Sequence, residues 1–189
     1  PVATNHKWEA TRGMGAAFGQ NANEPDDRLI DPDELIRSLV DMVAKNGNLL
    51  LNVGPDAAGT IVEREASRLR DLGAWMDVAG EALVGTRPWV EASATTPEGI
   101  DVRYTQAGGA VYAVLLATPV GTTVTLPGLA APAHRPVVLL GHGPLGAAAS
   151  GDDLVLAWPA TSPIGPAHAV RIGLRSPAER WQSGRSQSP

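Results

Sequence analysis

The hydrophobic positions of the chain follow two different spacings, and the change comes near residue 90. Between residues 31 and 83, apolar side chains recur every three or four residues, as on one face of an α-helix. From residue 100 onward, short runs alternate apolar and polar residues and are separated by Gly, Pro, Asp and Ser. The first half therefore predicts helices around a strand, and the second half predicts strands alone.

The best-marked helix begins at Asp31. The side chain of Asp31 is of the kind that caps the N-terminus of a helix, and Pro32 suits the first helical position. Glu34, three residues after Asp31, completes the Asp-x-x-Glu pattern of a capping box. The apolar residues that follow fall on one helical face, and Gly47 is expected to end the helix. These apolar residues are Leu35, Ile36, Leu39, Val40 and Val43.

A continuous apolar run, "NLLLNVG" at residues 48–54, comes next. It is too short for a buried helix and predicts a parallel strand covered on both faces. After the turn "GPDAAG", Thr60 and Glu63 form a second predicted capping box. The helix behind them is expected to end or bend near Gly80.

Upstream, "KWEATRGMGAAFGQNANE" at residues 7–24 begins as a short strand and continues as an irregular, glycine-rich loop. Two parallel strands with two helices leave sheet edges open and do not complete an α/β domain. Residues 1–92 are therefore interpreted as the closing strand-helix units of a (β/α)8-like barrel, whose earlier strands this chain lacks.

The second half predicts an all-β domain over residues 93–175. Six short strands with turn residues between them indicate a small antiparallel β-sandwich. Residues 176–189 have no periodicity and are predicted to be a disordered tail. The predicted strands are "IDVRYTQ", "AVYAVLLA", "TTVTLPG", "RPVVLLG", "DLVLAWP" and "HAVRIGL".

Composition excludes several kinds of partner. The net charge of -5 and the isoelectric point near 5.3 give no basic surface for nucleic acid or an anionic membrane. No apolar run approaches the roughly 18 residues that a membrane span needs. The chain has no cysteine, and its four histidines show no ligand spacing, so neither a metal site nor a cofactor is expected. The histidines are His6, His134, His142 and His168.

Arg12 and Glu24 are the first candidates for chemistry. Both lie in the loop after the first strand, and in an α/β barrel the loops at the carboxyl ends of the strands form the active face. The same pair also fits a surface ion pair or a helix cap, which are ordinary structural features. The residues by themselves leave both interpretations open.

The segments "KWEATRGMGAAFGQNANE", "LIRSLVDMVAKNGNLLLNVGPDAAGTI" and "LGAWMDVAGEALVGTRPW" resemble the C-terminal part of family 29 α-L-fucosidases. The resemblance covers residue 7 to about residue 89, and the sandwich more loosely. It implies a retaining glycoside hydrolase with a (β/α) barrel and an appended β-sandwich. The implied partner is a fucosylated oligosaccharide or glycoconjugate, from which terminal α-L-fucose is released.

The resemblance also implies site residues. The family motif Phe-Gly-Tyr-Asn-x-Asn-Glu matches residues 18–24, with Gln20 in place of tyrosine, and makes Glu24 the acid/base candidate. Arg12 corresponds to the family's substrate-contacting arginine. The nucleophilic aspartate of the family lies upstream of the match, so no nucleophile is expected in this chain. The expectation is a truncated enzyme that does not hydrolyse fucosides alone.

Four further residues have open roles. Trp8 is a substrate-binding candidate that either walls the fucose methyl group or packs in the ordinary way. Glu9, behind it on the strand, is a competing carboxylate or an internal hydrogen-bonding group that supports the site from outside. Asn48 and Asn52 bracket the second strand and either orient loop backbone or line the pocket floor.

A second hypothesis belongs to another class of function. The sandwich would be a non-catalytic carbohydrate-binding or subunit-contact module, with the first half as a barrel remnant. Exposed aromatic rings would support sugar binding, and Tyr104, Tyr112 and Trp158 are the sandwich's candidates. Apolar surface left open by absent strands favours association, including a homo-oligomer. A bacterial cytoplasmic location is weighed slightly above secretion.

Overall fold

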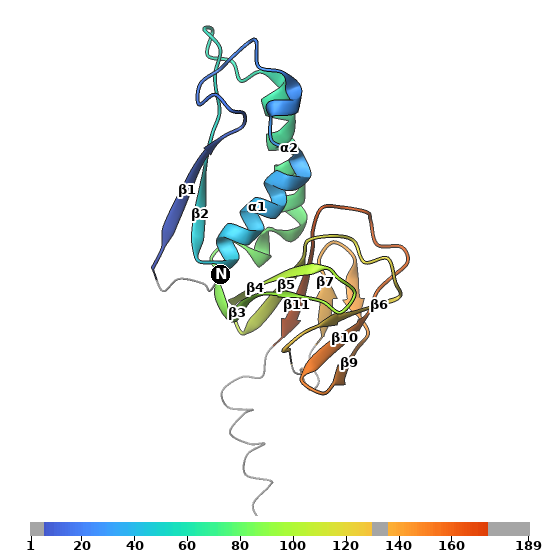
Figure 1. The fold of residues 1–189 in the computed structure, drawn as a ribbon. Helices are drawn as coiled ribbons and strands as arrows, with labels where there is room; N and C mark the ends of the chain where they lie inside the picture. Colours follow the sequence, from blue (N-terminus) through green and yellow to red (C-terminus); the bar gives the residue numbers. More distant parts are fainter. Residues whose placement is uncertain (1–5, 130–135, 174–189) are drawn as a thin grey trace, which may run out of the picture.

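The structure, a computed structural model, describes residues 6–129 and 136–173. Its first part alternates strands and helices, and in Figure 1 the two strands lie side by side with the two long helices next to them. The elements are β1 (Trp8–Gly13), the 3-10 turn η1 (Asp26–Arg28), α1 (Pro32–Ala44), β2 (Gly47–Asn52), α2 (Glu63–Ala79) and the 3-10 turn η2 (Gly80–Ala82).

The second part contains strands only. The elements are β3 (Arg87–Thr95), β4 (Asp101–Ala107), β5 (Ala110–Leu115), β6 (Thr123–Leu126), β7 (Val137–Leu139), β8 (Gly143–Leu145), β9 (Ala147–Ser150), β10 (Asp153–Ala157) and β11 (His168–Gly173). They form a six-stranded sheet in the order β3-β4-β5-β11-β7-β8 and a three-stranded sheet in the order β6-β10-β9. All six predicted strands are present. The sequence pattern missed β3, β8 and β9, which are half-exposed or exposed and therefore show little alternation.

The fold class predicted from the sequence is confirmed, with a barrel remnant followed by a β-sandwich. The hydrophobic core of the sandwich is built from both sheets, with Tyr104, Leu126 and Leu154 among its fully buried side chains. Every residue from Val111 to Leu115 is buried, because the second face of β5 packs against the helices. This sheet is therefore covered on both faces, which explains why β5 reads as a continuous apolar run.

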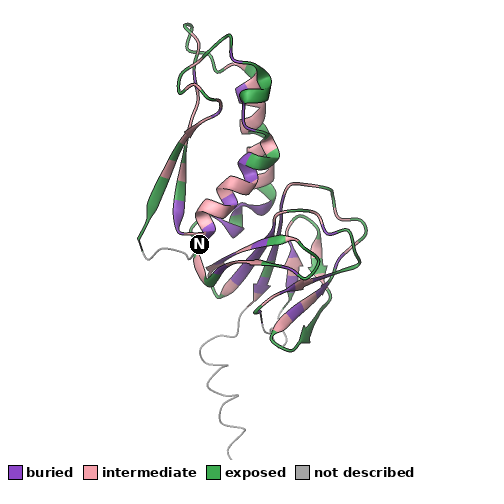
Figure 2. Cartoon of the chain, in the orientation of Figure 1, coloured by how far each residue is buried: buried purple, intermediate pink, exposed green. Residues whose placement is uncertain are grey.

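The β1–β2 pair is the remnant of the barrel. The two strands run parallel, with Trp8 opposite Gly47 and Gly13 opposite Asn52. Within the described residues each strand pairs on one edge only. The prediction that this strand is covered on both faces is wrong. Leu49 and Leu51 pack toward the helices, whereas Leu50 is 52% exposed, because no element of the described residues covers that face of the strand pair (Figure 2).

The helix ends test the capping predictions. The Asp31 side chain accepts hydrogen bonds from the amides of Asp33 and Glu34, as predicted for the N-cap of α1. The predicted stop at Gly47 is wrong, since α1 ends at Ala44 and Asn46 takes the left-handed turn with φ 69°. Asparagine is one of the few residues that tolerates that conformation.

The second capping box is also wrong. α2 begins at Glu63, with Val62 at the N-cap and no side-chain cap bond. The Thr60 amide instead binds the Asp56 side chain in the preceding turn, since a side chain that shapes a turn competes with helix capping. The expected end near Gly80 is confirmed, because the helix passes there into η2.

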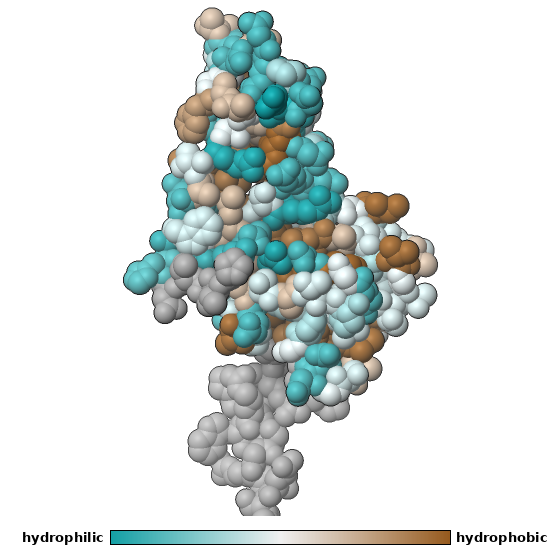
Figure 3. All heavy atoms as spheres, viewed as in Figure 1, coloured by the Kyte–Doolittle hydropathy of each residue, from teal (hydrophilic) through white to brown (hydrophobic). Residues whose placement is uncertain are grey.

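The two parts pack directly on each other. Ile36, Val40 and Ala79 of the helices form one hydrophobic cluster with Tyr112 and Val114 of β5. Figure 3 shows mostly hydrophilic side chains over the helical part on this face, and separate hydrophobic patches over the sandwich. The helices therefore face β1 and β2 on one side and the sandwich on the other.

Hydrogen bonds also join the helices to the loops of the sandwich. The Arg37 Nε donates to the carbonyls of Leu116 and Pro166 at 3.1 and 3.2 Å, and the Trp75 indole donates to the Ala167 carbonyl at 3.0 Å. The predicted tail at residues 176–189 and His134 lie outside the described residues. The domain limits at residues 92 and 175 stay predictions.

Candidate functional site

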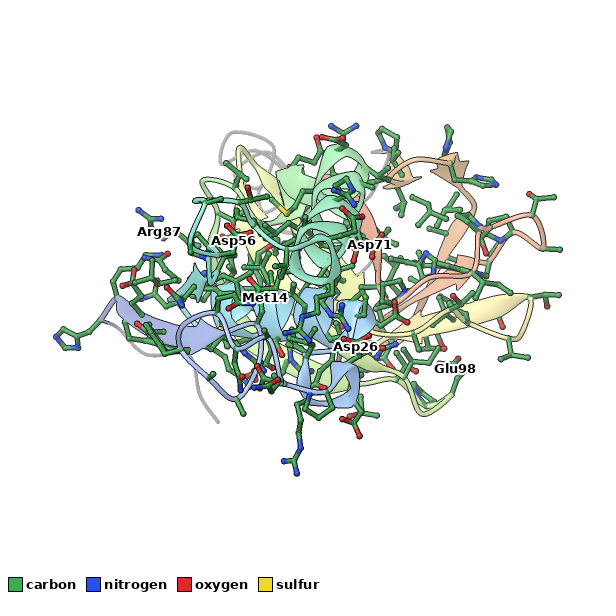
Figure 4. The ribbon with its side chains drawn as sticks, turned by 90° about the horizontal axis from the view of Figure 1, so that it is seen from above. Met14, Asp26, Asp56, Asp71, Arg87 and Glu98 are labelled. Carbon is green, nitrogen blue, oxygen red and sulfur yellow. The ribbon has the colours of Figure 1, made fainter. Side chains whose placement is uncertain are left out.

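Two loops meet at the carboxyl ends of β1 and β2. The first, called the Glu24 loop, comprises residues 14–30, and the second comprises residues 53–62. Both lie at the upper end of the molecule in Figure 1, and Figure 4 looks down on them with Met14, Asp26 and Asp56 labelled. This is the end of the strands at which α/β barrels place their chemistry.

The Glu24 loop is closed at its base. Met14 is 2% exposed and belongs to the small hydrophobic core between the strands and the helices. The Ile30 amide donates to the Met14 carbonyl at 2.7 Å, so both ends of the loop are joined. The irregular, glycine-rich segment is thus a loop with a fixed base.

Glu24 is buried inside this loop, at 9% exposure. Its Oε1 accepts hydrogen bonds from the amides of Ala16 at 2.6 Å and Ala17 at 3.4 Å. A Cβ atom on Gly15 would lie 2.7 Å from the Glu24 Cδ. Position 15 therefore needs glycine for the carboxylate to approach the backbone this closely.

The surroundings of the Glu24 carboxylate decide what it can do. The amides of Ala16 and Ala17 hold the carboxylate against the backbone of its own loop. To reach a leaving group as an acid, the carboxyl group has to turn away from these amides. The site therefore holds a buried carboxylate that is bound by the backbone of its own loop.

The end of β2 holds the second side of the loop. The Asn52 side-chain amide donates to the Phe18 carbonyl. A Cβ atom on Gly54 would lie 2.7 Å from the Gln20 Cα, so the two loops touch through backbone. The contact with Phe18 supports the loop-orienting interpretation of Asn52.

Helix α2 supplies residues that the sequence reading missed. Arg64 donates to the carbonyls of Asn21, at 2.7 Å, and Glu24, and it pairs with Asp26 at 3.3 Å. Arg68 donates to the Ile30 carbonyl at 2.7 Å. Both arginines stand one turn apart, at a spacing that reads in the sequence as an ordinary charged helix face.

Glu65 is the other missed residue. It is 6% exposed, and its carboxylate accepts the Gly54 amide at 3.0 Å. Its place four residues before Leu69 put it on the apolar side of α2, which was the one signal of burial in the sequence.

The remaining predicted residues are not gathered at this end. Trp8 begins β1, lies against Gly47 and donates its indole N–H to the Lys45 carbonyl at 2.9 Å, so it packs against the end of α1. Glu9 and Asn48 are opposite each other in register and exposed, near the start of the strands.

Arg12 does lie near the loop end, as the penultimate residue of β1, and is half-buried. Within the described residues, no hydrogen bond or ion pair joins it to Glu24. The structure thus brings Arg12, Asn52 and Glu24 to one end of the strands.

The sandwich offers little for a sugar. Tyr104, Tyr112 and Trp158 are 1%, 7% and 5% exposed, so their rings belong to the core. An apolar pocket of about 340 Å³ lies between α2 and the loop before β11, lined by Trp75, Val78, Ile164 and others.

In residues 6–129 and 136–173 no three His, Asp or Glu residues are grouped to hold a metal, and no helix is long and apolar enough to cross a membrane.

His168 and Asp41, two of the groups whose pKa is shifted, lie away from the two loops. Burial lowers the pKa of His168, which is hydrogen-bonded to Thr118 at 2.7 Å beside the ring of Trp158. Burial opposes ionisation of Asp41, but hydrogen bonds from Lys45 and Arg103 outweigh it and hold the Asp41 pKa below its usual value. Asp41 joins α1 to β4 through Arg103, and His168 joins β11 to the loop that contains Thr118.

This chain is similar to known proteins over most of its length. Residues 2–81 match the family model Alpha-L-fucosidase. The α-L-fucosidase of Branchiostoma floridae is 35% identical over 147 residues, 69% of this chain and 32% of that protein. The tissue α-L-fucosidase of Homo sapiens is 35% identical over 117 residues, 61% of this chain and 24% of that protein. The chain thus spans about a quarter to a third of these relatives.

The solved structures that this chain resembles are also α-fucosidases. The Thermotoga maritima α-fucosidase in complex with fucose has a TM-score of 0.79 and 34% identity, over 88% of this chain and 40% of that chain. The α-L-fucosidase isoenzyme 1 of Paenibacillus thiaminolyticus has a TM-score of 0.75 and 29% identity, over 90% and 40%. The resemblance to α-L-fucosidases that the sequence motifs indicate is confirmed.

Proposed function

We propose that this chain, a relative of the α-L-fucosidases, forms the C-terminal part of a retaining glycoside hydrolase that releases terminal α-L-fucose. The observation that carries the proposal is the buried Glu24 carboxylate in a glycine-rich loop at the carboxyl ends of two parallel strands. The proposed substrate is a fucosylated oligosaccharide or glycoconjugate, in keeping with the fucose complex of the Thermotoga maritima relative.

In this proposal Glu24 is the acid/base. It gives a proton to the glycosidic oxygen while a nucleophilic carboxylate attacks the anomeric carbon and the aglycone leaves. It then takes a proton from the water that attacks the same carbon and frees the nucleophile. Arg12 donates hydrogen bonds to oxygens of the sugar or the nucleophile.

Retention needs a second carboxyl group about 5 to 5.5 Å from the first. The partners of the Glu24 carboxylate in the described residues are the amides of Ala16 and Ala17, and the neighbouring Asp26 is paired with Arg64. We propose that the nucleophile is a carboxylate outside these 189 residues and that the chain alone does not hydrolyse fucosides.

The test is hydrolysis of an aryl α-L-fucoside by this chain and by the chain extended upstream in its reading frame. The extended protein is expected to be active and to lose that activity on Glu24→Ala, with partial rescue by azide. Asp27→Asn is the matched control, because Asp27 is an exposed carboxylate in the same loop. Activity of the 189-residue chain alone, or an active Glu24→Ala variant without azide, would contradict the proposal.

A further inference from the structure

Arg64 is the residue that ties the Glu24 loop to helix α2. Its guanidinium donates to the main-chain carbonyls of Asn21 and Glu24, which lie three residues apart in the loop. The Glu24 amide in turn donates to the Asn21 carbonyl at 3.1 Å, so this pair closes a turn. Arg64 therefore binds the turn that carries Glu24 at both of its ends.

The side chain of Arg64 suits this task. It is 23% exposed, and its flat guanidinium offers several donors in a fixed arrangement, so it can bond two carbonyls at once. The ion pair with Asp26 contributes less, because the Asp26 side chain is 79% exposed and water screens the pair. The bonds to the two carbonyls are the part of the contact that sets the backbone of the loop.

The neighbours of Arg64 on α2 fix its own position. Arg68, one turn later, donates to the carbonyls of Ile30 and Arg64, and thus ties the helix to the base of the same loop. Glu65 accepts the Gly54 amide and ties the first turn of α2 to the exit of β2. The first two turns of α2 therefore hold both loops at the carboxyl ends of the strands.

We propose that Arg64 is a positioning residue for Glu24, an inference that rests on the function proposed above. By holding the carbonyls of Asn21 and Glu24, it fixes the turn from which the Glu24 side chain reaches the amides of Ala16 and Ala17. Arg64 does not touch the reacting atoms. It acts by keeping the turn that carries the Glu24 carboxyl group at one place.

The first experiment uses the 189-residue chain and measures hydrogen exchange of the amides of Ala16, Ala17 and Glu24. Arg64→Ala is expected to raise their exchange rates by roughly tenfold or more, because two bonds to the turn are lost. Arg64→Lys is expected to give an intermediate rate, since an ammonium group does not span both carbonyls in the same way.

Two controls separate this effect from general loosening. Arg70→Ala removes an arginine from the same helix whose ion pair with Glu63 is exposed, and the loop amides should then exchange within about twofold of the unsubstituted chain. Asp26→Asn should likewise have little effect. Loop amides that exchange no faster in Arg64→Ala than in Arg70→Ala would overturn the inference, and so would an Asp26→Asn variant that reproduces Arg64→Ala.

The second experiment uses the chain extended upstream and compares two fucosides. A poor leaving group such as phenol needs protonation, whereas 2,4-dinitrophenol leaves without it. If Arg64 positions the acid, Arg64→Ala lowers kcat/KM, which reports the step that expels the leaving group, at least about tenfold more for the phenyl fucoside than for the dinitrophenyl fucoside. Equal losses on both substrates would overturn the inference, whereas an inactive unsubstituted protein would refute the proposed function itself.

Discussion

Replacing Gly15 by alanine should displace the Glu24 carboxylate. The added Cβ would lie 2.7 Å from Cδ and 2.8 Å from Oε1 of Glu24, well inside the roughly 3.5 to 4.0 Å of ordinary contact. Since Glu24 is 9% exposed and the other side of the contact is backbone, the carboxylate has to leave its place. The amides of Ala16 and Ala17 then lose their acceptor.

The size of the effect follows from these bonds. The Ala17 bond, at 3.4 Å, is weak, so the Ala16 bond at 2.6 Å sets the size. A hydrogen bond to a charged group contributes about 1.5 to 3 kcal/mol, and its loss is partly offset by the roughly 0.4 to 1 kcal/mol gained when alanine stiffens the unfolded chain. The free energy of unfolding should therefore fall by about 1 to 2 kcal/mol. For a chain of this length, that lowers Tm by roughly 2 to 8 °C.

Urea and thermal unfolding of Gly15→Ala, Gly19→Ala, Glu24→Ala and the double variant Gly15→Ala/Glu24→Ala test this prediction. Gly19→Ala is the matched control, because no heavy atom lies within 4 Å of a Cβ at that position in the same loop. Gly15→Ala in a Glu24→Ala background should cost less than about 0.5 kcal/mol, because the colliding carboxylate is gone. The same cost with and without Glu24 would refute the reasoning, as would a Gly19→Ala variant that is equally destabilised.

Three further predictions concern stability and pH. Glu65→Ala should lower the free energy of unfolding by about 1 to 3 kcal/mol, because the Gly54 amide loses its buried acceptor, whereas Glu63→Ala on the exposed side of the same turn should change it by less than about 1 kcal/mol in urea unfolding. The pKa of His168 is lower in the folded chain than in the unfolded chain, so the unfolded chain takes up the proton first as the pH drops. The contribution of neutral His168 to stability is therefore fully present above pH 6.5 and is lost as the pH falls from there toward the folded-state pKa. Unfolding measured from pH 7 to pH 5 should show a smaller slope in His168→Asn, and an unchanged slope would contradict this assignment. Gly73→Ala should raise the free energy of unfolding by up to about 1 kcal/mol, and Tm with it, because no heavy atom lies within 4 Å of a Cβ at that helix position. A lower Tm would show that the added Cβ does meet neighbouring atoms.

The capping residues show how far local sequence reaches. Asp31 was predictable as a cap because its side chain bonds amides two and three residues away, and such a contact depends on nothing distant. Thr60 failed because Asp56 competes for its amide in the turn, a choice that the motif alone does not reveal. Asn46 replaced Gly47 at the end of α1 because either residue tolerates the left-handed conformation.

The sequence by itself determined the order of the elements, the change from helical to strand spacing, and the loop in which Glu24 lies. Each of these follows from contacts between residues close in the chain. Only the tertiary structure decided that Arg64 holds that loop, that Glu65 holds the loop after β2, that Leu50 faces outward, and that Trp8 packs at the far end of the strand. These outcomes depend on which distant segments meet, since the burial of a side chain and the partner of a carbonyl are set by what packs there and not by its neighbours in sequence.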